Sequence, residues 1–220
     1  MKKNILIKIL TTSVISLFLI QVLYVSVAEP TVILAAGPAT DNVVVTLNVT
    51  AGISLSTPTV VTMAPNLGVG INGSVGATSW TVQTNSLNGY TLSLKSAGAP
   101  NSLTGTSGSF PDYGELTPGI PEVWTIPATT KEFGYSAFGT NVNGTTWGAA
   151  ATCGTGGATL TTTGRNYVGL KTTDKEIARS ATVTPVAGTI TNVCFAAAQN
   201  GVFAASGSYS ATVTATGVAL

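Results

Sequence analysis

Alternation of apolar and polar residues is the feature that most constrains the fold of this chain. Its clearest instance follows Asn42, where one row of side chains consists of Val43, Val45, Leu47 and Val49 and the other row is mostly polar. A period of two is typical of a strand with one face in a core. Further strands are expected near residues 78–97, 132–140, 189–197 and 208–218. Many short strands separated by Gly, Pro and Asn predict an all-β protein, an antiparallel β-sandwich of the Ig-like or pilin-like kind with long loops.

Two of these strands flank the sequence Leu87-Asn88-Gly89. Apolar residues alternate on both sides of it, so we expect the two strands to form a hairpin. A three-residue loop would place Val82 opposite Leu94, keeping apolar side chains on one face, whereas a two-residue loop would mix apolar and polar residues. We therefore predict the three-residue loop.

The rest of the chain adds one short helix and one long loop region to this plan. Thr173 and Glu176 have the spacing of a capping box, which predicts a helical turn over residues 173–179. Residues 98–130 are rich in Pro and Gly, and we expect a loop-rich insert there with a short strand near 123–126. We interpret residues 41–220 as a single β-sandwich domain preceded by a flexible lead at residues 29–40.

The N-terminal 28 residues have the pattern of an export signal. Three lysines precede an uncharged stretch, which ends in the small residues Ser26-Val27-Ala28. The alternative is an uncleaved membrane anchor, because the 20 residues from Ile9 to Ala28 are just long enough to span a bilayer core. Either reading places the protein outside the cytoplasm, secreted or at the cell surface, with membrane contact only through this segment.

Low charge narrows the range of functions. Charged residues make up 8% of the chain, against roughly 25% in ordinary soluble domains, and 37 threonines supply much of the polarity. Cleavage after residue 28 would leave six basic and eight acidic residues, a net charge of −2. We expect no nucleic-acid binding, because phosphate recognition needs clustered cations.

Histidine is absent from the sequence. The usual catalytic triads and His-based zinc sites are therefore excluded. The close carboxylate pairs are Asp112 with Glu115 and Asp174 with Glu176. We interpret both as solvated surface charge, or for Asp112 and Glu115 at most a weak calcium site that would need several further oxygens. The chain is expected to be no enzyme and to need neither a metal nor a cofactor.

Two cysteines, Cys153 and Cys194, are the only ones in the sequence. An even number of cysteines in an exported chain predicts a disulfide between them.

Two groups of residues are candidates for binding. Five of the 14 charges that remain after cleavage lie within nine residues, where they form either a solubilising loop or a partner patch: Lys171, Asp174, Lys175, Glu176 and Arg179. Aromatic residues concentrate between residues 110 and 147. Because loop aromatics often stack on sugar rings, we consider Phe110, Tyr113 and above all Trp124 as a ligand platform for a glycan.

Both ends of the chain resemble exported bacterial β-sandwich surface proteins, of the spore coat protein U and fimbrial-subunit type. The matching residues are the strand Val43-Val44-Val45-Thr46-Leu47-Asn48-Val49-Thr50 and the closing segment 207–216. Proteins of the coat protein U type usually have a cysteine just after the first strand, where this chain has Ile53-Ser54. The resemblance implies an Ig-like sandwich and a surface role, in which a terminal strand completes a neighbour's sheet.

Two functions follow as hypotheses. The first is a non-catalytic, exported structural protein, a filament or envelope subunit that associates with itself or with other envelope proteins by donating the strand near Val43–Val49. The second is a glycan-binding adhesin that uses the loop aromatics.

Overall fold

The computed structural model describes residues 41–98 and 102–220, so the predicted signal and the lead at residues 29–40 lie outside the described residues. Residues Val49–Leu220 form one compact unit, and Asn48 marks the end of a separate N-terminal unit. Every strand pairing in the described part is antiparallel, which confirms the all-β prediction. No helix among residues 41–98 and 102–220 has the length and apolar character needed to cross a membrane.

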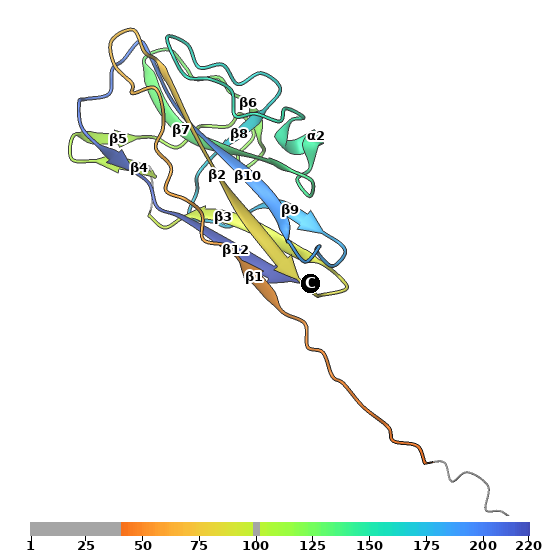
Figure 1. Cartoon of the computed structure of the whole chain (residues 1–220). Coiled ribbons are helices and arrows are strands. Elements are labelled where there is room, and N and C mark those ends of the chain that lie inside the picture. The colour runs from red at the N-terminus through yellow and green to blue at the C-terminus, as the bar shows by residue number, and fades with distance from the viewer. Residues whose placement is uncertain (1–40, 99–101) are drawn as a thin grey trace, which may run out of the picture. The chain divides into compact units, whose positions relative to one another are not determined.

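The larger sheet has six strands in the order β1-β2-β10-β7-β8-β6 (Figure 1). Its strands are β1 (Ile53–Leu55), β2 (Gly73–Thr84), β10 (Thr189–Asn200), β7 (Thr130–Gly139), β8 (Asn166–Gly169) and β6 (Glu122–Val123). The long strands β2, β10 and β7 form its centre, where β10 pairs over most of its length with both neighbours.

Two three-stranded sheets complete the fold. The first has the order β12-β3-β9, with β12 (Val213–Ala219), β3 (Tyr90–Ser96) and β9 (Lys175–Ser180). The second has the order β11-β4-β5, with β11 (Tyr209–Ser210), β4 (Leu103–Gly105) and β5 (Gly108–Phe110). The core between the six-stranded sheet and the β12-β3-β9 sheet joins Trp80 and Val82 of β2 to Leu92 and Leu94 of β3. The sandwich prediction is therefore correct.

The predicted hairpin across Gly89 is wrong. Strand β2 belongs to the six-stranded sheet and β3 to the opposite one, so residues 85–89 connect the two layers of the sandwich (Figure 1). Val82 and Leu94 are both fully buried, as alternation requires, but they face each other across the core rather than along a ladder. Gly89 is needed here because its φ is +80° and an added Cβ would lie 2.8 Å from the amide nitrogen of Thr182.

The predicted helical turn at residues 173–179 is also wrong. Residues Lys175–Ser180 form β9, which pairs with β3 and buries Ile177 and Ala178. Burial of these two side chains in the core outweighs the local capping signal. The short helix of the described part is α2 (Gly144–Trp147), whose first turn is capped by the Asn143 side chain.

A second, smaller core lies on the other face of the six-stranded sheet. It consists of Cys194, Ala196 and Ala198 of β10, covered by Tyr113, Trp124 and Tyr167. Residues 111–127 and 150–165 therefore pack on a sheet face that would otherwise meet solvent. This layer contains three of the candidate site residues, Tyr113, Trp124 and Cys153.

Candidate functional site

The aromatic residues predicted as a ligand platform are buried. Relative exposure is 2% for Phe110, 0% for Tyr113 and 9% for Trp124. A sugar ring needs an accessible aromatic face, so the platform prediction is wrong for these three residues. Phe133, Tyr135 and Trp147, which are also aromatic, belong to the main core.

Trp124 has a structural role in the second core. Its ring stacks on Tyr113 with a centroid distance of 4.6 Å and meets Tyr167 edge-on at 5.2 Å. Gly134 makes room for the indole, because a Cβ added to it would lie 3.0 Å from the Trp124 ring and 2.9 Å from Tyr113. A glycine on β7 thus allows the two rings to lie directly against the sheet.

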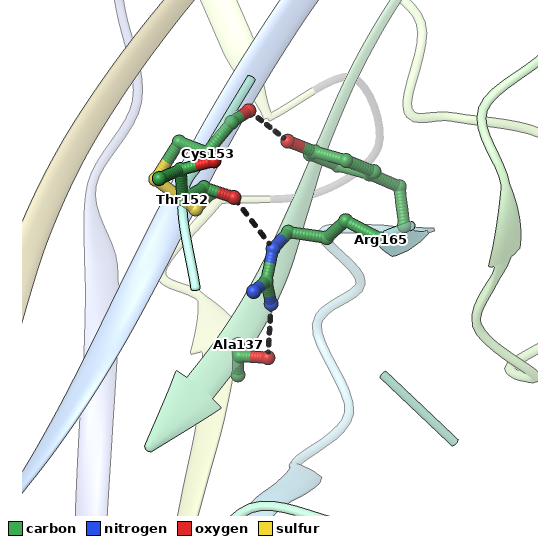
Figure 2. Close-up of a disulfide and its surroundings, with 6 residues drawn as sticks. Ala137, Thr152, Cys153 and Arg165 are labelled. Atoms are coloured by element: carbon green, nitrogen blue, oxygen red, sulfur yellow. Dashed lines mark hydrogen bonds between the residues drawn. A yellow bond between two sulfur atoms is a disulfide. The ribbon is translucent and has the colours of Figure 1, made fainter. Parts of the chain in front are cut away.

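The disulfide between Cys153 and Cys194 is present, as predicted. Cys194 lies at the centre of β10, and Cys153 lies in the segment that crosses the outer face of the sheet. The Tyr167 hydroxyl donates a hydrogen bond to the carbonyl of Cys153 at 2.9 Å. The disulfide and this hydrogen bond (Figure 2), together with two backbone hydrogen bonds between Gly157 and Gly73 of β2, attach this segment to the sheet.

Arg165 lies beside the disulfide and is almost completely buried, with 1% exposure. Its Nε donates to the carbonyl of Thr152 at 2.9 Å and its Nη1 to that of Ala137 at 2.8 Å (Figure 2). The guanidinium also lies over the Phe138 ring, 4.4 Å from its centroid. Burial lowers the pKa of Arg165, and carbonyl dipoles and the ring compensate the charge in place of a carboxylate. The sequence shows a lone arginine here and does not reveal this role.

The five charges between Lys171 and Arg179 are largely engaged within the chain. Asp174 pairs with Lys95 at 3.2 Å, and Glu176 pairs with Arg179 at 2.6 Å. Lys175 donates a hydrogen bond to the carbonyl of Gly119 at 2.7 Å. The hydrogen bonds that the Arg179 guanidinium donates to Glu176 raise the pKa of Arg179.

The carboxylates at residues 112–132 cap backbone amides. Asp112 accepts from the amide of Ser102 at 3.0 Å, and Glu115 accepts from that of Gly169 at 2.5 Å. Glu132 is buried, which raises its pKa, although the amide of Gly114 and the charge of Lys171 oppose this shift. Asp112 and Glu115 therefore serve as backbone acceptors rather than as freely solvated charges.

No group of three or more Cys, Asp or Glu side chains suited to a metal ion occurs within residues 41–98 and 102–220. A hollow of about 610 Å³ lies at the ends of β7, β9 and β10, lined by Asn141, Val183, Pro185 and Ile190 among others. None of its lining residues titrates, so it offers no acid–base group.

The predicted strand at Val43–Val49 is not formed within the chain. Residues 41–52 belong to no strand, and the four apolar side chains of the row are 75–85% exposed: Val43, Val45, Leu47 and Val49. The expectation that this row would enter the chain's own core is wrong, because β1 begins only at Ile53 and occupies the edge of β2. Four large apolar side chains in one exposed row mark this segment as the candidate functional site.

Comparisons with protein-family models, with curated proteins and with solved structures find no match to this chain.

Proposed function

We propose that this chain is an exported, non-catalytic structural protein of the cell surface, whose subunits assemble by strand addition. The observation that carries the proposal is the exposed apolar row of Val43, Val45, Leu47 and Val49. Covering one such side chain stabilises an assembly by about 1.5–3 kcal/mol. The free backbone of the same segment can pair with an edge strand of a neighbour.

Export is supported by two independent features. The first 28 residues have the pattern of a signal sequence. The disulfide between Cys153 and Cys194 is of the kind that persists in oxidising compartments. Together they support a protein that works outside the cytoplasm, where a subunit of a filament or envelope layer would be found.

Low charge supports self-association. Two ion pairs, Lys95 with Asp174 and Glu176 with Arg179, use four of the charges in the described part. Much of the remaining surface is polar without charge, so two copies meet with little electrostatic repulsion.

A pair of charge-matched variants tests the donor segment. In the first, Val45→Asp and Leu47→Asp place two charges in the apolar row, and in the second, Val60→Asp and Val69→Asp place them at two exposed apolar residues outside the segment. Secreted wild-type protein is expected to form polymers that size-exclusion chromatography and negative-stain microscopy detect.

We expect the first variant to stay monomeric, because two carboxylates would be buried on donation, and the second variant to keep assembling. Melting temperatures of both variants should equal that of the wild type, since all four substituted side chains are exposed. A wild-type protein that remains monomeric, or equal assembly by both variants, would refute strand donation.

A further inference from the structure

The described sheets have six edge strands, which differ in how well they are protected against pairing with a strand of another chain. Four of them, β1, β6, β5 and β11, have only two or three residues each. Strand β9 has six residues but carries Lys175, Glu176 and Arg179, and charged residues on an edge discourage pairing with another chain. Strand β12 has seven residues, Val213–Ala219, with neither a charge nor a proline.

The hydrogen bonds of β12 leave one side of its backbone open. The amide of Leu220 donates to the carbonyl of Gly89, and the carbonyl of Thr212 accepts from the amide of Ala97. In this register the even-numbered residues bond to β3. The odd-numbered residues, whose N–H and C=O groups point away from β3, are Val213, Ala215, Gly217 and Ala219. No second strand pairs with β12 among the described residues, so these groups remain open.

The core beneath this open edge is incompletely covered. On β3, the inward side chains of Leu92 and Leu94 are fully buried. On β12, by contrast, Val213 and Ala215 are only partly buried where they pack against the core. The residues near the edge of the opposite sheet, Ile53 and Leu55 of β1, are partly buried as well.

We propose that the outer edge of β12 is the acceptor for residues 43–49 of a second copy of this chain. The proposal rests on strand addition as the proposed function and adds where the donated strand binds. Donor and acceptor are both seven residues long and uncharged. The apolar row of the donor would extend cover over the partly buried core residues. On the outer face, its Thr46 would lie beside Thr216 and its Asn48 beside Thr214.

A charge on the acceptor edge tests this assignment. Thr216 is exposed on β12, so Thr216→Lys should fold normally and block the edge as β9 blocks its own. The control, Val123→Lys, places the same charge at a residue that is 65% exposed on the edge strand β6. We expect loss of polymers for Thr216→Lys and wild-type polymers for Val123→Lys.

Cross-linking between two single-cysteine variants gives a second readout that does not depend on losing assembly. Thr46→Cys and Thr216→Cys proteins are mixed and oxidised, and the native disulfide, whose Cys194 is fully buried, stays intact. A mixed disulfide-linked dimer is expected, whereas Thr46→Cys mixed with Val123→Cys should give none.

The outcomes separate this inference from the function on which it rests. If Thr216→Lys polymerises normally and the Thr46–Thr216 mixture does not cross-link, β12 is not the acceptor, although strand donation stands as long as the Val45→Asp, Leu47→Asp variant is monomeric. If the wild-type protein never polymerises, both proposals fail.

Discussion

Loss of the disulfide should remove a substantial part of the folding stability. The bond joins residues 41 positions apart, and the loop-closure entropy of a loop this long corresponds to about 4 kcal/mol at 25 °C. In a domain of this size, each kcal/mol shifts the melting temperature by about 2–4 °C. We therefore expect the protein without the disulfide to melt about 8–16 °C lower.

Two forms without the disulfide distinguish chain entropy from packing. The reduced wild-type protein keeps both sulfur atoms, whereas the Cys153→Ala, Cys194→Ala variant also loses their contacts in the second core. Both forms should lose about 4 kcal/mol of stability from the added chain entropy of the unfolded state. The alanine variant should lose somewhat more in total, because it also removes the fully buried sulfur atom of Cys194.

Urea unfolding followed by intrinsic fluorescence and circular dichroism measures both losses. Because the disulfide acts largely by restricting the unfolded chain, the dependence of the unfolding free energy on urea should steepen when it is removed. A loss below about 1 kcal/mol for the reduced wild type would refute the entropic reasoning. It would indicate that the unfolded chain without the disulfide keeps residual structure between residues 153 and 194.

Three further substitutions test the packing and the buried groups. Gly89→Ala should cost more than Gly70→Ala in thermal melts, because both glycines have positive φ but only Gly89 has backbone atoms where the Cβ would lie; equal losses would contradict this. Glu132→Gln should stabilise the protein most at neutral pH, and this gain in stability should shrink towards pH 4. The reason is that a carboxyl with a raised pKa in the folded state costs stability as pH rises above its unfolded pKa of about 4.5. A stability difference that does not change with pH would exclude the raised pKa. Burial raises the pKa of Tyr167 to about 12, so wild-type stability should fall between pH 10 and 12. Tyr167→Phe should reduce the slope of that fall by about 1.4 kcal/mol per pH unit. At pH 7 the variant should be less stable, because it loses the hydrogen bond to Cys153.

Alternation in the sequence predicts the strands well but not their partners. Trp80, Val82, Leu92 and Leu94 are buried as the period of two requires. The same pattern is satisfied whether β2 and β3 lie side by side or face each other across the core, because in both arrangements the apolar rows meet. Partner choice depends on contacts with β10 and β12, more than 100 residues away in the sequence.

The sequence does indicate that the aromatic residues are buried, but through an uninterrupted apolar run rather than through alternation. The run from Val193 to Ala198 is apolar without interruption, and such a run is typical of a strand with both faces buried. It predicts a layer over the outer face of β10, and Tyr113, Trp124 and Tyr167 supply that layer. No comparable pattern predicts the position of Arg165. Its hydrogen-bond acceptors are the backbone carbonyls of Thr152 and Ala137, and every residue type has such a carbonyl.

The distribution of charge between the two long edge strands supports assembly more strongly than low charge alone. A chain that has few charges and needs to stay monomeric would be expected to place them on its exposed edges, and β9 has three of them. Strand β12 has none, although it is the longest edge strand in the described part. Low charge over the whole surface would only permit association. Charge present on one edge and absent from the other would give the proposed association a direction, because a donated strand would be discouraged at β9 and not at β12.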